Sequence, residues 1–266
     1  MLRQLILRLA PKQAAMLRPV LRDVRRRMRD IRTPSTTAVI QSAPSFGADS
    51  GVLYRMFLEH KGDDLFKWHH YFAIYERYFA RFRDQPISLL EIGVRGGGSL
   101  ALWRQYFGPR ARITGIDIDP ACVEFRSEGT EIFIGDQVDR KFLADVADQR
   151  GPFDIVIDDG GHTTRQQIVS YEALFPHVKD GGVYLVEDLH TNLWGPYLDH
   201  PLGVSFLDVA SRMAEKLTWW HNRVEPKKPD QSDVPAIARS VFSIAFYDSI
   251  VVFEKMRIPE PHHEIR

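Results

Sequence analysis

The sequence predicts a doubly wound α/β fold with a seven-stranded, mostly parallel sheet and an antiparallel C-terminal edge hairpin. Five short apolar runs alternate with helix-length intervals between residues 88 and 186. Two more apolar runs, residues 241–247 and 250–254, are separated only by Asp248 and Ser249. So short a connection requires an antiparallel hairpin. Together these observations favour an open sheet with a reversed edge strand.

Length and composition indicate a globular body that carries a separate basic segment. The 266 residues are 44% hydrophobic and 26% charged, which allows a sizeable core in one or two domains. The net charge is zero, yet residues 1–32 contain ten Lys/Arg and two Asp. The acidic remainder argues against nucleic acid as the main partner. The single cysteine, Cys122, excludes an intrachain disulfide and fits a reducing compartment.

Residues 1–32 predict a basic amphipathic helical arm, because apolar residues fall at helical spacing with arginines on the other face. This arm either stays solvated or packs in an oligomer, contacts an anionic membrane, or acts as a transit peptide. Residues 33–50 read as a linker and 51–266 as the main domain. No apolar run reaches the roughly 18 residues of a membrane span, and no clear signal peptide is present. We expect a cytoplasmic homo-oligomer, with the inner membrane face as a peripheral site.

Residues 52–82 have a helical pattern that is rich in aromatic side chains, most of which we expect in the core. The KWHHY cluster, residues 67–71, fits core or surface packing and equally a pocket wall. The following region alternates regularly. Expected strands lie at 88–92, 112–116, 131–134, from 155, and 183–186, and expected helices at 99–107, 140–147, 164–175 and 204–217.

Three local signals set the ends of these helices. Ser99 is expected to cap the first helix of the alternating region. Thr163 and Gln166 have the spacing of a capping box. Gly181 and Gly182 are expected to stop the preceding helix before the fifth strand.

Residues 89–100, LLEIGVRGGGSL, combine a strand, a glycine-rich turn and a helix start. Glycine lets the backbone approach a ligand closely there. Glu91 lies within the strand, Asp117 ends the second strand at the place of a ribose-hydroxyl acceptor, and Asp136 ends the third. So acidic a site suits a cationic nucleoside such as S-adenosylmethionine better than a pyrophosphate. Binding of an NAD-type cofactor and a purely structural turn are the alternatives.

Acidic residues follow the fourth and fifth strands, Asp158 and Asp159 after one, Glu187 and Asp188 after the other. The carboxyl ends of parallel strands share one edge of the sheet, so these acids should meet in a cleft. Like charges there require a cation, and oxygen ligands suit Mg²⁺. Salt bridges without metal are the alternative. Asp158 is assigned more readily to the scaffold than to a ligand.

His162 is a candidate general base, because the ordinary pKa of histidine, about 6.5, lets it accept a proton near neutral pH. A role as metal ligand or as a satisfied polar residue also fits. A facial triad for non-haem iron, formed by His162, His190 and one carboxylate, is a separate hypothesis. His221, Trp194 and Tyr197 fit stacking on a ligand ring and core packing equally.

Six stretches resemble the metal-dependent class I methyltransferases that O-methylate sugars, including macrolide sugars and methylmannose polysaccharide. They are EIGVRGGGSL, GIDIDP, IGDQ, DIVIDDGGH, GGVYLVEDLH and YDSIVVFEK, within about residues 67–255. The resemblance implies a Rossmann-like class I methyltransferase domain in residues 51–266. It also implies S-adenosylmethionine and Mg²⁺ as cofactors.

In that family, the residues that match Asp159, Glu187 and Asp188 bind magnesium, and the histidine that matches His162 is the base. Asp159 and His162 are thus the candidate catalytic residues. Arg95 stands where relatives often have glycine, so its role is open. Candidate cofactor-binding residues are Glu91, Gly93, Gly96, Gly97, Ser99, Asp117, Asp136, Gln137 and Asp158.

The predicted function is metal-dependent methyl transfer from S-adenosylmethionine to a sugar hydroxyl of a glycoside, glycolipid or polysaccharide. A catechol or other phenol is the alternative acceptor. An iron-dependent hydroxylase and a non-catalytic binding module are the alternative classes.

Overall fold

The computed structural model describes residues 51–222 and 234–266. The predicted arm, 1–32, and linker, 33–50, lie outside these residues and stay predictions, as do the oligomer and the cytoplasmic location. The strands are β1 (Ser88–Ile92), β2 (Arg112–Asp117), β3 (Thr130–Ile134), β4 (Phe153–Asp158), β5 (Val178–Val186), β6 (Val241–Tyr247) and β7 (Ile250–Lys255).

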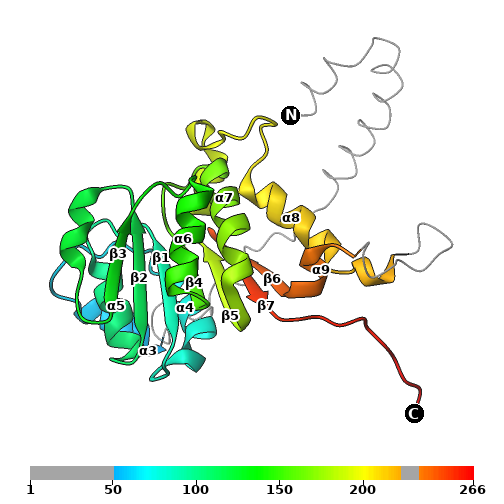
Figure 1. The fold of residues 1–266 in the computed structure, drawn as a ribbon, viewed down its shortest axis with the longest axis horizontal. Coiled ribbons are helices and arrows are strands. Elements are labelled where there is room, and N and C mark those ends of the chain that lie inside the picture. Colours follow the sequence, from blue (N-terminus) through cyan, green and yellow to red (C-terminus); the bar gives the residue numbers. More distant parts are fainter. Residues whose placement is uncertain (1–50, 223–233) are drawn as a thin grey trace, which may run out of the picture. The chain divides into compact units, whose positions relative to one another are not determined.

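All seven strands form one sheet in the order β3-β2-β1-β4-β5-β7-β6 (Figure 1). The pairs among β1 to β5 are parallel, whereas β7 runs antiparallel to both β5 and β6. The predicted seven-stranded, mostly parallel sheet with a C-terminal antiparallel hairpin is therefore confirmed.

The α-helices of the described part are α3 (Gly51–Glu59), α4 (Tyr71–Phe79), α5 (Gly98–Phe107), α6 (Arg140–Arg150), α7 (Thr164–Leu174), α8 (Phe206–Lys216) and α9 (Ala236–Ser240). Short 3₁₀ turns occur between them, including η6 (Leu189–Leu193) and η7 (Gly195–Tyr197). The predicted capping box is present at the start of α7, where Thr163 and Gln166 bond reciprocally to the backbone.

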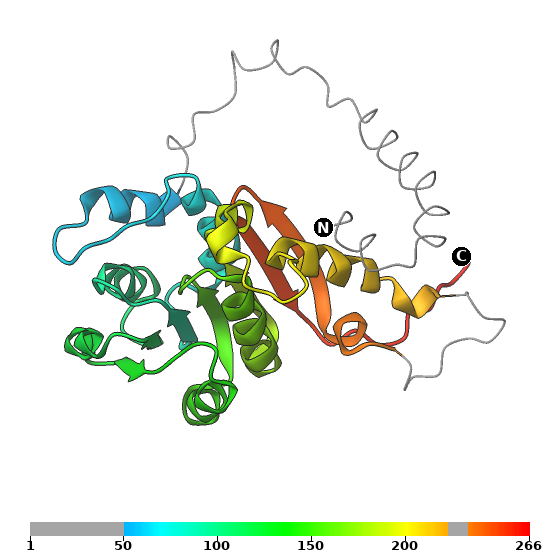
Figure 2. The same cartoon turned by 90° about the horizontal axis from the view of Figure 1, so that it is seen from above.

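Side chains that alternate along the central strands bury two cores, one on each face of the sheet. On one face, Leu89 and Ile155 pack with residues of α3, α4 and α5. On the other, Leu90 and Val156 pack with residues of α6, α7 and α8. The two layers of helices are visible in Figure 2. Both faces of the parallel strands are covered, which explains their continuous apolar sequence.

Two predicted element ends were wrong. Gly97, with φ 75°, is the N-cap of α5, and Ser99 lies inside the helix with its hydroxyl bonded elsewhere. Gly181 and Gly182 lie within β5 and do not precede it. The pairing shifts there, because Phe153 faces Val178 whereas Ile155 faces Val183. The extra residues form an irregularity at which Gly181 adopts φ 81°.

The sheet register places the predicted site residues side by side. Ile92 pairs with Asp158, and Asp158 pairs with Val186. The residue that follows each of these strands therefore emerges at one edge. The Asp159 amide donates to Ile92 O (3.0 Å), and the Glu187 amide to Asp158 O (2.9 Å). The acidic turns are thereby fixed to their neighbouring strands.

No helix among residues 51–222 and 234–266 combines the length and apolar character that crossing a membrane requires.

Candidate active site

A pocket of ≈ 330 Å³ lies at the carboxyl ends of the parallel strands. In a doubly wound sheet this edge is the usual ligand site. Nine predicted site residues line it: Gly93, Ser99, Asp117, Asp136, Gln137, Asp159, His162, Glu187 and Asp188. Glu91, Gly96, Gly97 and Asp158 are not among the lining residues. The sequence thus placed most of its candidates around one cavity.

Gly93 is where the glycine-rich turn meets the turn after β4. Its φ is 94°, and an added Cβ would lie 2.1 Å from the backbone oxygen of Asp159. No other residue type fits so close a backbone approach. Arg95 also adopts a left-handed φ of 49°. This backbone conformation suits glycine, the residue often found at this position in the sugar O-methyltransferases that the sequence resembles. The Arg95 guanidinium lies 5.5 Å from the centre of the Phe66 ring.

Asp117 holds the glycine-rich turn in place. Its Oδ2 accepts from the amides of Val94 (2.8 Å) and Arg95 (2.9 Å), and its Oδ1 from the amide of Asp119 (2.9 Å). Partial burial alone would raise the pKa of Asp117, but these backbone donors outweigh it and lower the pKa. The carboxylate therefore stays ionised at the pocket wall, where Oδ1 has room for another donor.

Glu91 lies behind the pocket wall. It is fully buried, and its Oε2 accepts from the Ser99 hydroxyl (2.8 Å) and the Trp103 indole (3.1 Å). Burial, opposed in part by Lys67, raises the pKa of Glu91 to about 7. The hydrogen bond between Glu91 and Ser99 links the end of β1 to α5 beneath the glycine-rich turn.

Gln137 and Asp158 brace the DDGGH turn from within. The Gln137 amide donates to Asp158 Oδ1 (3.2 Å), and its Oε1 accepts from the Gly161 backbone (2.7 Å). Tyr184 donates to Asp158 Oδ2 (3.2 Å). Burial raises the pKa of Asp158 to about 7, although these donors oppose the shift. Asp136 lies exposed at the rim, where it accepts from the Val138 amide (3.0 Å).

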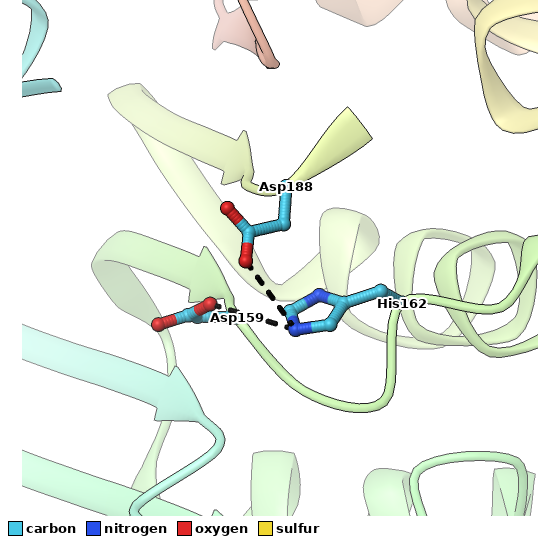
Figure 3. A group of neighbouring side chains, drawn as sticks. All are labelled: Asp159, His162 and Asp188. Atoms are coloured by element: carbon cyan, nitrogen blue, oxygen red, sulfur yellow. Dashed lines mark ion pairs between the residues drawn. The ribbon is translucent and has the colours of Figure 1, made fainter. Parts of the chain in front are cut away.

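Asp159, His162 and Asp188 converge on one point of the pocket. One ligand atom from each lies within 4.8 Å of the other two. His162 Nε2 is 3.9 Å from Asp159 Oδ1 and 3.7 Å from Asp188 Oδ2. Figure 3 shows the three side chains pointing toward one another from the turns that follow β4 and β5. Two carboxylate oxygens and one imidazole nitrogen are ligands that a divalent cation accepts.

Backbone strain accompanies this convergence. His162 and Asp188 have φ values of 61° and 54°, in the left-handed region that is unusual outside glycine. Such conformations persist where surrounding contacts impose them, and they cluster at functional sites. The hydroxyl of Thr191 donates to His162 O (3.2 Å), and Tyr71 donates to Asp188 Oδ1 (2.7 Å). These contacts hold both residues in place.

Glu187, the third predicted metal ligand, makes other contacts. It is only 1% exposed, and it accepts from Tyr75 OH at Oε1 (2.6 Å) and from Lys67 Nζ at Oε2 (2.9 Å). His162 takes its place in the convergent group. The acidic pair after β5 is thus divided: Asp188 belongs to the convergent group, whereas both oxygens of Glu187 accept hydrogen bonds, from Lys67 and Tyr75.

Lys67, Tyr71 and Tyr75 are site residues to which the sequence gave no individual role. Tyr71 and Tyr75 are four residues apart on α4, a spacing that puts both hydroxyls on one helix face. Burial, reinforced by Glu187, keeps the pKa of Tyr75 well above its ordinary value, so Tyr75 remains a donor. The KWHHY cluster was the available signal, and its lysine and tyrosine, more than its histidines, reach the acids.

The histidines of that cluster have structural contacts. His69 Nδ1 bonds to the Tyr54 hydroxyl (2.8 Å), and His70 packs against the Tyr71 ring with centroids 4.7 Å apart. His190 Nδ1 lies 3.9 Å from Asp188 Oδ1 but is not part of the convergent group. His221 does not line the pocket. The geometry therefore does not bring His162 and His190 together as an iron triad.

An aromatic row leads outward from the pocket. Trp68 lines the pocket and lies 5.8 Å from His190, which lies 5.1 Å from Trp194, which in turn lies 5.7 Å from Tyr197 (ring centroids). Trp68 is 45% exposed and Trp194 50% exposed. Large exposed aromatic rings beside a polar site commonly mark a ligand-binding groove.

Comparison with known proteins agrees with this geometry. Residues 90–189, from β1 to the turn after β5, match the family model described as "Methyltransferase domain". The matched residues contain the glycine-rich turn, Asp117, the DDGGH turn and Asp188. The signal in the sequence and the geometry of the pocket thus point to the same chemistry.

Among characterised relatives, two sugar O-methyltransferases are informative. The chain is 36% identical over 227 residues to 8-demethyl-8-alpha-L-rhamnosyl tetracenomycin-C 2'-O-methyltransferase of Streptomyces olivaceus, covering 80% of this chain and 57% of the relative. It is 46% identical over 129 residues to mycinamicin VI 2''-O-methyltransferase of Micromonospora griseorubida, covering 45% and 31%. The predicted resemblance to the sugar O-methyltransferases is confirmed.

A solved structure shows the same fold. The methyltransferase MycE of the mycinamycin pathway, in complex with Mg, S-adenosylhomocysteine (SAH) and mycinamycin VI, aligns with a TM-score of 0.64 and 31% identity. The alignment covers 73% of this chain and 50% of MycE. The chain thus spans about half the length of the relatives it matches.

Proposed function

We propose that the protein transfers a methyl group from S-adenosylmethionine to a sugar hydroxyl of a glycoside, with a divalent cation, Mg²⁺ by preference, as cofactor. The convergence of Asp159, His162 and Asp188 next to a glycine-rich nucleoside site carries this proposal. Relatives named as sugar O-methyltransferases, and the Mg and SAH in MycE, support it.

The cofactor half fits a cationic nucleoside. Gly93 permits close approach, and ionised Asp117 offers an acceptor to ribose hydroxyls. Asp136 and the acids that follow β4 and β5 add negative electrostatic potential along the pocket. A sulfonium donor is attracted by this field, whereas a pyrophosphate would be repelled.

The metal half fits an oxygen-preferring cation. Asp159 and Asp188 would hold it, with His162 next to both. A bound Mg²⁺ would act as a Lewis acid that makes a neighbouring hydroxyl more acidic. His162 Nε2, the nitrogen that faces both carboxylates, is the proposed proton acceptor for the sugar hydroxyl. The protein's remaining task is to hold the acceptor oxygen in line with the methyl group.

The acceptor subsite is the aromatic row of Trp68, His190, Trp194 and Tyr197. Sugar rings present apolar C–H faces that pack on aromatic rings, and the row begins at the pocket wall. We therefore propose an acceptor with several rings, of which the methylated sugar enters the pocket and the next lies along the row. Polar groups beside the rings would fix its orientation.

Trp194→Ala tests this subsite. The KM for a glycoside acceptor should rise about three- to tenfold with little change in kcat, because stacking contributes to binding away from the reacting atoms. Steady-state kinetics would measure the change. Phe242→Ala is the matched control, since Phe242 is 57% exposed on β6 and does not line the pocket. A fall in kcat at constant KM would contradict a binding role.

Labelled methyl transfer tests the proposed function. The purified chain would be incubated with methyl-labelled S-adenosylmethionine, Mg²⁺ and a panel of rhamnosides, other glycosides and catechols. Label should enter glycosides, and EDTA should stop transfer until Mg²⁺ is restored. Methyl transfer that persists after thorough EDTA treatment would show that the reaction needs no metal. Preferential methylation of catechols would show that the acceptor is a phenol and not a sugar. Oxygen consumption with bound iron would indicate a hydroxylase.

A further inference from the structure

We propose that Lys67 is a built-in counter-ion that occupies one oxygen each of Asp159 and Glu187 and so limits how tightly a divalent cation binds between Asp159 and Asp188, next to His162. Lys67 acts through these carboxylates, so it is a positioning residue. The inference rests on the metal site of the proposed function, and it assigns that site a tunable affinity.

The contacts of Lys67 join the two halves of the site. Its Nζ lies 2.6 Å from Asp159 Oδ2, 2.9 Å from Glu187 Oε2 and 3.5 Å from Glu91 Oε1. These acids come from β1 and from the turns after β4 and β5. The residue is 8% exposed and its side chain 2% exposed, so water contributes little to its solvation. One ammonium therefore donates hydrogen bonds to Asp159 and Glu187 and forms a longer ion pair with Glu91.

Burial favours a counter-ion beside these acids, because it disfavours their charged forms. Two of the three acids, Glu91 and Glu187, are almost fully buried and would repel each other and Asp159 without a cation. Removing one partner of a buried ion pair leaves an uncompensated charge, which is strongly destabilising. Lys67 supplies the compensation when no metal is bound.

The same contacts decide which atoms remain for a metal. Both oxygens of Glu187 are engaged, one by Lys67 and one by Tyr75. Asp159 keeps Oδ1, which faces His162 Nε2, as does Asp188 Oδ2. A divalent cation there shares Asp159 with a lysine ammonium and is repelled by it. Lys67 thus keeps metal binding weaker than the number of acids alone would give.

Lys67→Met tests the counter-ion, because methionine keeps an unbranched chain and removes the charge. The variant should bind Mg²⁺ about tenfold more tightly by isothermal titration calorimetry. In EDTA its Tm should fall by about 10 °C, and Mg²⁺ should restore most of the loss. Lys179→Met is the matched control, since Lys179 pairs with one acid, Asp154, at 2.7 Å outside the pocket. It should leave Mg²⁺ affinity unchanged.

The double variant Lys67→Met/Glu187→Gln covers the case in which the single variant does not fold without metal. Removing the uncompensated carboxylate should raise its Tm in EDTA above that of Lys67→Met. A lower Tm for the double variant, or weaker Mg²⁺ binding by Lys67→Met, would contradict the proposal that Lys67 is the counter-ion of these acids. Equal Mg²⁺ binding by wild type and Lys67→Met would overturn only the role of Lys67. Absence of binding in both would overturn the metal site itself.

Discussion

His162→Ala is expected to lower kcat for methyl transfer by about 10² to 10⁴ while leaving SAH affinity unchanged. A sugar hydroxyl is hardly ionised at neutral pH, so loss of its proton acceptor slows the attack directly. His162 Nε2 lies 3.9 Å from Asp159 Oδ1 and 3.7 Å from Asp188 Oδ2, beside the proposed metal site. Labelled-methyl kinetics and calorimetric titration with SAH measure the two quantities.

His162→Asn is the companion variant. Alanine at φ 61° adds backbone strain, whereas asparagine tolerates the left-handed region and also lacks the imidazole. Both variants should therefore lose turnover, and only the alanine variant should lose stability. A parallel loss of SAH affinity in both would show that His162 shapes the pocket and does not move the proton. A loss of Mg²⁺ affinity in both would make it a metal ligand.

Asp188→Asn should weaken Mg²⁺ binding by about 100-fold or more, since changes even to the partners of metal ligands cost 10- to 100-fold. The substitution is clean. Asparagine accepts the φ of 54°, and its side-chain oxygen can still accept from Tyr71 OH. Methyl transfer should fall at low Mg²⁺ and recover in part at high Mg²⁺, which kinetics at graded Mg²⁺ would show.

Asp248→Asn is the control for this variant. Asp248 is an exposed acid in the β6–β7 turn and does not line the pocket. Its replacement changes the net charge equally and should not alter Mg²⁺ affinity. Unchanged Mg²⁺ binding in Asp188→Asn would exclude this carboxylate as a ligand and leave Asp159 to hold the cation without it.

The sheet was predictable because its strands are buried on both faces and end in recognisable residues. The runs at β1, β6 and β7 agree with the predicted bounds to within one residue. The capping box at Thr163 is a short-range signal that needs no tertiary context. The predicted helix cap at Ser99 was wrong because the Ser99 hydroxyl donates a hydrogen bond to Glu91. This contact across the β1–α5 turn competes with capping.

Part of the site was predictable for the same reason. Acids at the ends of parallel neighbours must share an edge, so Asp159 and Asp188 were expected to meet, and they do. Lys67 was not expected, because it lies 92 positions before Asp159 and outside any helix or strand. Only the fold of the segment before α4 brings it to the acids. The division between Glu187 and Asp188 depends on that lysine.

The contact of Gly93 with the carbonyl of Asp159 has a consequence for how this protein can diversify. The two turns that we propose to position the methyl donor and the proton acceptor touch main chain to main chain at Gly93. Substitutions of neighbouring side chains should therefore leave their separation unchanged, whereas any side chain at Gly93 itself would push the two turns apart. Acceptor preference can change through segments such as η6 and η7 while the reacting distance stays constant. New specificities are accessible there without rebuilding the chemistry.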